Sequence, residues 1–225
     1  MSLKITCLGQ GSKGNCWIAD YNGELLLIDA GLSIKTIKKG IDYNLVAVQG
    51  VLVTHNHRDH SMAVEDLQNC GIPMFIPFAV SQRKRTLGHY QVRAFSVPHG
   101  DCECFGFLIE IAGYRFIYAT DLELIPYTFK TWGLNTIIVE CNYQDEYIDK
   151  EADNFQHKAL DHAELKTTVG IVEANLTDNL QNVIITHMGE TSCNAIECCD
   201  AIRAVVPETV NVDYARAGET WILIP

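Results

Sequence analysis

The stretch "VLVTHNHRDH", residues 51–60, decides how the rest of the sequence is interpreted. An apolar run ends at Thr54, and the residues that follow include His55, His57, Asp59 and His60. A hydrophobic core has no need for so dense a group of imidazoles and carboxylates, whereas borderline divalent metals are bound by these two ligand types. The stretch therefore predicts a metal site at the end of a strand.

Polar residues occupy the same kind of position elsewhere, directly after apolar runs. They are Asp29 after "LLLI", His99 after "AFSVP", Asp121 after "FIYAT" and His187 after "VIIT". Any one of them alone is more simply explained as a turn residue, a helix cap or a loop histidine. As a set, they could meet at one edge of a sheet, because each follows a strand-like run.

The length of 225 residues fits one domain, since single domains commonly have about 100 to 250 residues. We therefore expect residues 1–225 to form a single domain. No apolar run reaches the roughly 20 residues that a membrane-spanning helix needs. The N-terminal segment also lacks the apolar stretch of a signal peptide. These features predict a cytoplasmic protein without a membrane partner.

Short β-branched and apolar runs bounded by Gly, Pro, Asn or Asp recur along the chain and predict strands. They lie at 3–8, 16–21, 24–29, 51–54, 74–77, 90–97, 105–111, 114–120, 136–140, 182–186 and 220–224. Apolar residues at helical spacing predict helices at 33–41, 61–69, 162–175 and 193–205. Strands with interspersed helices, and no linker between them, predict a layered α/β domain.

The nine cysteines are odd in number and irregularly spaced. In a chain expected to be cytoplasmic, this favours reduced thiols over a disulfide framework. Cys102 and Cys104 form one close pair, and Cys198 and Cys199 form another. Neither pair has a second pair at zinc-finger spacing, so the sequence favours buried or surface thiols over a cysteine metal site.

The formal net charge of −11 has the wrong sign for broad, nonspecific attraction to nucleic acid. The segment "QRKRTLGHYQVR", residues 82–93, is the clearest basic exception. The net charge therefore argues against nucleic-acid binding without excluding it.

The motifs "LLIDAG", "THNHRDH", "SVPHGD", "YATD" and "IITHMG" together resemble the five ordered motifs of the metallo-β-lactamase superfamily. The resemblance extends over nearly the whole chain. It implies an α/β fold that is a four-layer αβ/βα sandwich, in which two mixed β-sheets are flanked by helices. It also places the metals at one edge of the sheets.

The same resemblance implies two divalent metal ions, with zinc first and manganese or iron(II) as alternatives, because such N/O donors accept several metals. His55, His57 and His99 would hold one ion, Asp59, His60 and His187 would hold the other, and Asp121 would bridge them. Asp29 would support the loops without binding metal. A metal-bridging hydroxide would then be the nucleophile, and Asp59 would both bind metal and orient this hydroxide.

Superfamily members hydrolyse lactams, lactones, thioesters and phosphodiesters, so these motifs alone leave the substrate open. Asp121 stands where the best-known secreted β-lactamases carry a cysteine, and His57 stands where the oxygen-reducing diiron branch carries a glutamate. This chain therefore resembles neither of those two branches.

Glu140, at the end of "IIVE", and His162, ahead of a predicted helix, resemble the acid–base pair of RNase Z-like phosphodiesterases. The resemblance implies that His162 protonates the leaving alkoxide and that Glu140 orients it, which suits phosphodiester cleavage. Each residue alone is more simply a strand-end acid or a helix-start residue.

The glycine-rich loop "GQGSKGNC", residues 9–16, includes Ser12 and Asn15 and could cradle an anionic substrate through its backbone N–H groups. It lacks Walker spacing. The loop resembles the YycJ/WalJ-like subgroup, whose members resemble DNA exonucleases, whereas the segment "THMGETSCNA" departs from that subgroup.

The sequence thus predicts a dinuclear metal-dependent hydrolase, a phosphodiesterase or nuclease whose partner is nucleic acid or a small phosphodiester. The alternatives are a lactone or thioester hydrolase of the same fold and a non-catalytic metal-binding protein. The native metal, DNA versus RNA, and the oligomeric state stay open.

Overall fold

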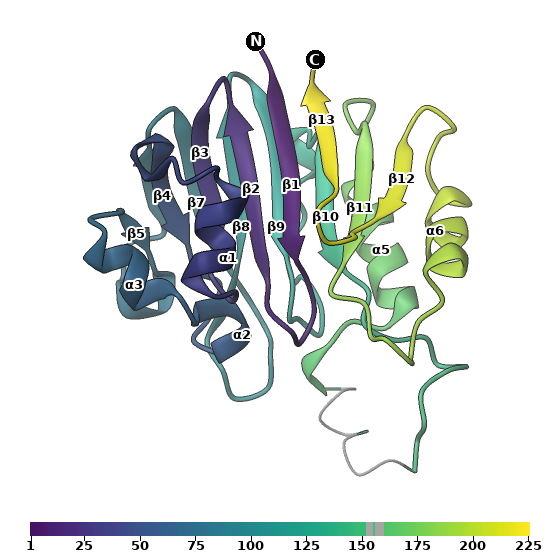
Figure 1. Ribbon diagram of the computed structural model, residues 1–225. Helices are drawn as coiled ribbons and strands as arrows, with labels where there is room; N and C mark the ends of the chain where they lie inside the picture. Colours follow the sequence, from purple (N-terminus) through teal and green to yellow (C-terminus); the bar gives the residue numbers. More distant parts are fainter. Residues whose placement is uncertain (152–154, 156–159) are drawn as a thin grey trace. The chain divides into compact units, whose positions relative to one another are not determined.

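The structure is a computed structural model that describes residues 1–151, 155 and 160–225. Its chain divides into two compact units, one formed by Met1–Ala94 with Arg216–Pro225 and the other by Phe95–Ala215. Each unit has a buried apolar core of its own. The single domain expected over residues 1–225 stays a prediction. Figure 1 labels the helices and strands.

The first unit contains a six-stranded sheet with the order β13-β1-β2-β3-β4-β5. Its strands are β1 (Leu3–Gly9), β2 (Cys16–Tyr21), β3 (Glu24–Ile28), β4 (Val48–Leu52), β5 (Met74–Phe75) and β13 (Thr220–Ile224). Strands β13, β1, β2 and β3 pair antiparallel, whereas β3, β4 and β5 pair in parallel. Ile28 of β3 lies opposite Leu52 of β4, so the segments after these two strands leave the sheet at the same edge.

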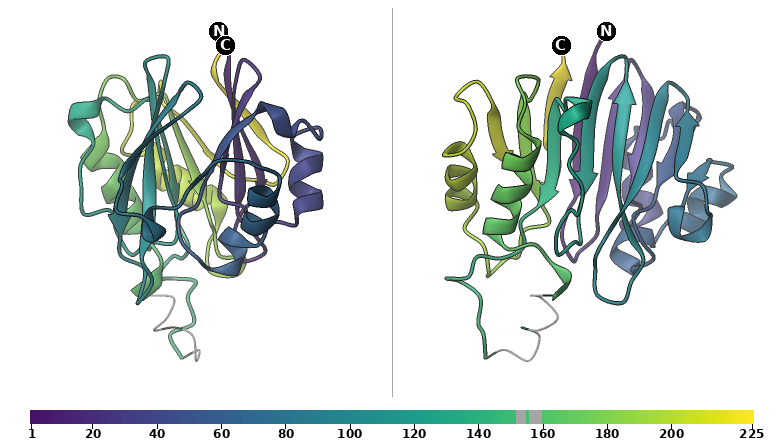
Figure 2. Two further views of the ribbon diagram at one scale, coloured as in Figure 1. Left: turned by 90° about the vertical axis from the view of Figure 1, so that its left-hand side faces the viewer. Right: turned by 180° about the vertical axis from the view of Figure 1, so that it is seen from behind.

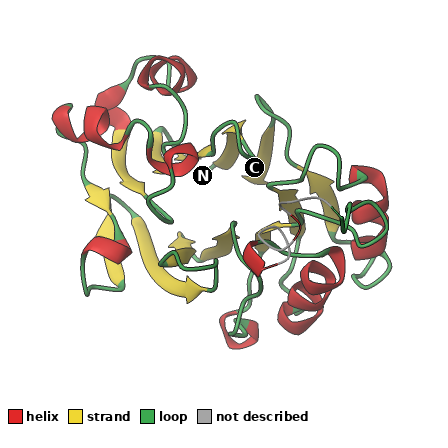
Figure 3. Ribbon diagram, turned by 90° about the horizontal axis from the view of Figure 1, so that it is seen from below, coloured by secondary structure: helices red, strands yellow, loops and turns green. Residues whose placement is uncertain are grey.

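Helices α1 (Ile34–Gly40), α2 (Arg58–Ser61) and α3 (Val64–Asn69) belong to the same unit, as do the short helices η1 (Leu45–Ala47) and η2 (Pro77–Ala79). Helix α1 begins after Ser33, whose hydroxyl accepts the Thr36 N–H. Ile37 of α1 and Leu67 of α3 are fully buried in the core that includes residues of β2, β3 and β4. Helices therefore flank the first sheet, as Figure 3 shows by colour.

Strands β6 (Lys84–Leu87) and β7 (Tyr90–Val97) form an antiparallel hairpin. The sequence predicts β7 with these bounds but misses β6, because "KRTL" is polar and only Leu87 is buried. Strand β6 stands last in the order of the second sheet. Lysine and arginine on such an edge discourage pairing with another chain.

The remaining strands belong to the second unit. They are β8 (Cys104–Ile111), β9 (Tyr114–Ala119), β10 (Thr136–Glu140), β11 (Asn182–Thr186) and β12 (Asn211–Tyr214). The strand order of the second sheet is β12-β11-β10-β9-β8-β7-β6. Strands β9 to β12 pair in parallel, with Val139 opposite both Ala119 and Ile185. Residues that follow these strands therefore leave the sheet at one edge, which is where parallel sheets carry ligand sites.

Helices α5 (Leu165–Asn175) and α6 (Ala195–Arg203) lie beside β10, β11 and β12 in Figures 1 and 2, and the short helix η3 (Lys130–Trp132) precedes β10. Helix α6 begins after Asn194, whose side-chain oxygen accepts the Ile196 N–H. Apolar residues of α5 and α6, such as Val172 and Ile202, are fully buried in the second core.

The predicted α/β class with two mixed sheets flanked by helices is confirmed. Some boundaries differ. The strand predicted at 51–54 occupies Val48–Leu52. The helix predicted at 162–175 begins at Leu165, because Glu164 is its N-cap. Strand β12 was not predicted. No helix among the described residues is long and apolar enough to cross a membrane.

Candidate active site

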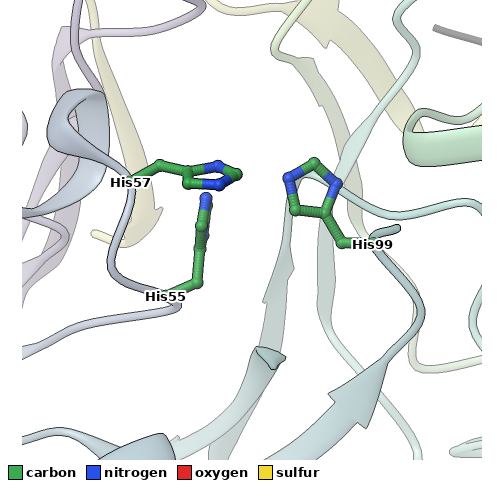
Figure 4. Close-up of side chains that lie close together, drawn as sticks. All are labelled: His55, His57 and His99. Carbon is green, nitrogen blue, oxygen red and sulfur yellow. The ribbon is translucent and has the colours of Figure 1, made fainter. Parts of the chain in front are cut away.

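The loop after β4 brings four candidate ligands together within the first unit: His55, His57, Asp59 and His60. His55 and His60 are buried, Asp59 is half-buried and His57 is exposed. The ring centroid of His55 lies 4.5 Å from that of His57 and 4.3 Å from that of His60. Figure 4 shows the rings of His55 and His57, which meet edge to face at an interplanar angle of 81°. The close approach arises because α2 begins immediately after His57 and its single turn brings His60 back toward His55.

Asp29 holds this loop from the interior of the first unit, where its side chain is fully buried. Its Oδ1 accepts hydrogen bonds of 2.9 Å from both the backbone N–H and the hydroxyl of Thr54. Its Oδ2 lies 2.8 Å from Nδ1 of His60. A carboxylate that accepts the Nδ1–H fixes the tautomer that presents Nε2 to a metal. Asp29 therefore fits the supporting role that the sequence suggests.

We expect Asp29→Asn to lower the free energy of unfolding by about 2 kcal/mol. The amide nitrogen of asparagine cannot accept a hydrogen bond, so one of the donors from Thr54 or His60 would face another donor in a buried place. Urea denaturation measures the change. The matched control is Asp20→Asn, because Asp20 accepts the Gly23 N–H and is only half-buried. Equal losses of stability in the two variants would contradict the prediction.

The glycine-rich loop lies against the same ligands. Asn15 is fully buried, its Oδ1 accepts the Gly11 N–H at 2.9 Å, and its Nδ2 lies 2.8 Å from Nε2 of His60. The Asn15 N–H donates to the carbonyl oxygen of Asp59 at 2.7 Å. Ser12 is exposed. Asn15 therefore joins the loop to the ligand segment, and the substrate-binding roles of Ser12 and Asn15 stay predictions.

Gly31 marks the closest approach between the loop after β3 and the ligand segment. Its N–H donates to the carbonyl oxygen of Asn15 at 2.8 Å. A Cβ atom at this position would lie 1.6 Å from the carbonyl oxygen of Asp59, which is a backbone atom. Only glycine fits this contact, and this requirement was not apparent in the sequence.

The second unit brings together Asp121, Glu140, His162 and His187, which offer atoms within 4.8 Å of one another. Three of these residues come from neighbouring strands: Asp121 lies two residues after β9, Glu140 ends β10 and His187 follows β11. Nδ1 of His187 lies 2.8 Å from Oε1 of Glu140 and 3.1 Å from Oδ1 of Asp121. The parallel register of the strands thus places these side chains together.

Asp29, Asp121 and His187 share an unusual backbone conformation, with φ of 59°, 50° and 50°. Residues other than glycine seldom adopt positive φ, and the conformation costs free energy. Each of the three follows a strand end, so the chain turns sharply where the side chain enters the candidate site. Such strain is concentrated at functional positions in proteins.

Glu140 and His162 form a short hydrogen bond, with 2.7 Å between Oε1 and Nδ1. Glu140 is fully buried, and its Oε2 accepts the Leu122 N–H at 2.9 Å. Burial alone would raise the pKa of Glu140, but the charge and hydrogen bonds of His162 and His187 outweigh it and lower the pKa. Burial likewise opposes charge on His162, yet Glu140 raises its pKa to about 9. The pair is therefore a carboxylate next to an imidazolium.

His99 follows β7 in the second unit and is buried. Its Nδ1 lies 2.8 Å from the carbonyl oxygen of Asp161, and its ring centroid lies 5.5 Å from that of His162. Figure 4 shows its ring. A backbone carbonyl at Nδ1 orients the ring so that Nε2 can bind a metal, as the carboxylate of Asp29 does for His60.

Sequence reasoning missed three supporting groups: Thr54, the carbonyl of Asp161 and Asn142. Thr54 immediately precedes the histidine motif, so its position was a usable signal. Asn142 is buried, and its amide donates to the carbonyl oxygen of His187 at 3.1 Å. The carbonyl of Asp161 carried no signal, because any residue type supplies a carbonyl.

Comparisons with known proteins agree with the fold. Residues 9–71 match the model of the metallo-β-lactamase superfamily. The chain is 27% identical over 175 residues to exodeoxyribonuclease YycJ of Bacillus anthracis, and the match covers 66% of this chain and 66% of that protein, just under two thirds of its length.

Solved structures extend the similarity of fold to nearly the whole chain. The metallo-β-lactamase fold protein YhfI of Bacillus subtilis has a TM-score of 0.76 and 16% identity, covering 99% of this chain and 100% of that one. The short form of human tRNase Z has a TM-score of 0.64 and 13% identity, covering 97% of this chain and 98% of that one.

Proposed function

Because the chain contains a domain of the metallo-β-lactamase superfamily, a family of hydrolases, we propose that it is a metal-dependent phosphodiesterase that shortens DNA from an end. The Glu140–His162 hydrogen bond of 2.7 Å, next to Asp121 and His187, carries the proposal. A histidine held by a carboxylate can donate a proton, and a poor leaving group departs faster when it is protonated. The similarity to a protein named exodeoxyribonuclease favours DNA as the substrate.

The donor chemistry fits two divalent cations. In the first unit, His55, His57, Asp59 and His60 would supply ligands, and in the second unit, His99, Asp121 and His187 would supply ligands. Imidazole and carboxylate donors suit Zn²⁺, Mn²⁺ and Fe²⁺. The Nδ1 atoms of His60 and His99 already contact oxygen atoms of Asp29 and Asp161, the usual support of a metal-binding histidine. Bound divalent cations lower the pKa of water and neutralise charge on a phosphate group.

Two side chains of the second unit, Glu140 and His162, would assist the departure of the leaving oxygen. Cleavage of a P–O bond in DNA leaves a sugar alkoxide, which departs slowly unless it is protonated. His162 would donate that proton from Nε2. Glu140 holds Nδ1, so it fixes the orientation of the ring and stabilises its charged form. Glu140 is therefore a positioning residue for His162.

Local positive charge on the first unit also favours a polyanionic substrate. Lys84, Arg85 and Arg93 of the β6–β7 hairpin line a pocket of about 250 Å³. The chain as a whole carries a formal charge of −11, so this concentration of cationic side chains stands out. Lysine and arginine side chains provide the phosphate contacts in most complexes with nucleic acid.

The test is a cleavage assay with end-labelled single- and double-stranded DNA and RNA, carrying 5′-phosphate or 5′-hydroxyl ends. With Mn²⁺ or Zn²⁺, we expect progressive shortening of DNA, loss of cleavage on chelation, and recovery when metal is restored. Hydrolysis of lactones or thioesters without cleavage of any nucleic acid would instead identify a small-molecule hydrolase. Metal binding without any hydrolysis would identify a binding protein.

Metal binding has a readout that does not depend on activity. A ligand that binds only the folded state at about 100 times its Kd adds about 2.7 kcal/mol of stability. We therefore expect Zn²⁺ or Mn²⁺ to raise the thermal unfolding midpoint of the metal-free protein, and His55→Ala to reduce this rise. The matched control is His89→Ala, because the His89 side chain is 70% exposed at the β6–β7 turn. A rise that is unchanged in His55→Ala would contradict the assignment of His55.

A further inference from the structure

A second group of potential metal ligands lies in the second unit and consists only of thiols. The sulfur atoms of Cys141, Cys193 and Cys198 lie within 4.8 Å of one another. Cys141 and Cys198 are fully buried, and Cys193 is half-buried. None of the three is in a disulfide bond. The proposed DNA-cleaving reaction makes no use of these thiols.

The spacing of the sulfur atoms suits a metal with thiolate ligands. A Zn–S bond is about 2.3 Å long, so two sulfur ligands of a tetrahedral site are separated by about 3.8 Å. The Sγ atoms of Cys141 and Cys198 are 3.6 Å apart. Sγ of Cys193 lies 3.3 Å from the carbonyl oxygen of Cys141. The three thiols therefore form one face of a tetrahedron without large movements of the backbone.

Each thiol comes from a different element of the unit. Cys141 directly follows β10, Cys193 lies in the segment between β11 and α6, and Cys198 lies within α6. An ion bound to all three would cross-link these elements. Cys141 is also the residue next to Glu140, so the cross-link would fix the end of the strand that carries this carboxylate.

An oxygen atom could provide the fourth ligand of a tetrahedral ion bound to the three thiols. Oε1 of Gln144 lies 3.4 Å from Sγ of Cys198 and also accepts the Asn194 N–H at 2.6 Å. Because Cys193 is half-buried, water can also reach the group. A site with three thiolates and one oxygen ligand suits Zn²⁺, which binds soft sulfur ligands more readily than Mg²⁺ or Mn²⁺ does.

We propose that Cys141, Cys193 and Cys198 bind one Zn²⁺ ion as a structural site, distinct from the histidine and carboxylate ligands. Each thiol gives up its proton to the solvent as its sulfur binds the ion, so binding is stronger at higher pH. The proposal does not depend on the proposed function, because the site would hold an ion whether or not the protein cleaves DNA.

Cobalt substitution tests the site in the full-length protein, prepared without oxygen so that the thiols stay reduced. Co²⁺ bound to thiolates gives an intense charge-transfer absorption in the near ultraviolet, whereas nitrogen and oxygen ligands give none. We expect the intensity of this absorption to correspond to one thiolate-bound Co²⁺ per chain, whatever further Co²⁺ the histidine and carboxylate ligands bind, and we expect it to disappear when Zn²⁺ is added. We expect it to be weaker in Cys193→Ser, because one of the three thiolates is removed, and we expect this variant to fold because the side chain is half-buried and the replacement is small.

The matched control is Cys70→Ser, because Cys70 is exposed and lies in the first unit. This variant should keep the full absorption, and circular dichroism should show all three proteins folded. Absence of the absorption in the wild-type protein, or its full intensity in Cys193→Ser, would overturn the proposal. Isolation of a Cys141–Cys198 disulfide from protein purified in air, together with no thiolate absorption in the reduced protein, would instead identify a redox pair.

Discussion

His162→Ala lowers kcat for DNA cleavage about 10²- to 10⁴-fold in our expectation, while the metal content of the protein is unchanged. The imidazole would supply the proton that the leaving sugar alkoxide needs, and alanine cannot. The effect should depend on the leaving group. With bis(p-nitrophenyl) phosphate, whose nitrophenolate departs without a proton, the same variant should lose much less activity. Steady-state kinetics with both substrates and metal analysis of both proteins measure this difference.

Two further variants test whether the loss of activity in His162→Ala reflects proton donation. Glu140→Gln keeps the shape of the side chain but removes the charge that holds His162, so it should give a smaller loss with the same dependence on the leaving group. His89→Ala removes an exposed histidine and should leave both activities unchanged. Equal losses on the two substrates, or loss of bound metal in His162→Ala, would show that His162 has a structural or metal-binding role instead.

Gly31→Ala is expected to lower the free energy of unfolding by about 3 kcal/mol or more. The added Cβ would lie 1.6 Å from the carbonyl oxygen of Asp59 and 2.8 Å from the backbone nitrogen of Asn15. These two atoms are joined to each other by a hydrogen bond of 2.7 Å. Neither can move away without breaking that bond and shifting the ligand segment. Urea denaturation measures the loss of stability.

Gly170→Ala is the matched control for this substitution. Gly170 lies within α5, and no atom lies within 4 Å of the position that its Cβ would occupy. Because glycine costs about 0.5 to 1 kcal/mol relative to alanine in a helix, this variant should be unchanged or more stable. A Gly31→Ala protein as stable as the wild type would show that the loops separate easily, contrary to the prediction.

The sequence indicated the parts of the candidate site that depend on strand ends. Asp121, Glu140 and His187 were all recognised as residues at the ends of apolar runs, and a parallel sheet places such residues at one edge. The polar edge strand β6 was missed because its exposed residues give no apolar alternation. The start of α5 was placed at residue 162, but Glu164 is the N-cap and the helix begins only at Leu165.

Sequence patterns could not predict contacts between elements that are distant in the sequence. The spacing of Cys198 and Cys199 drew attention to neighbouring residues, whereas Cys198 in fact lies next to Cys141, 57 positions away. Likewise, nothing near Gly31 in the sequence reveals the carbonyl of Asp59. Local patterns report which residues share a strand or helix, but not which backbone atoms meet when loops fold together.

The pairing of β1 with β13 has a consequence for the order in which the protein can fold. Leu3 lies opposite Ile224 and Thr6 opposite Thr220, so the first sheet needs residues from both ends of the sequence. On the ribosome, residues 95–215 are synthesised before β13 exists. Until then, β1 has an open edge, which is a template for pairing with other chains. The first unit is therefore the first to be synthesised in part and the last to be complete, because its sheet gains β13 only at the end of synthesis.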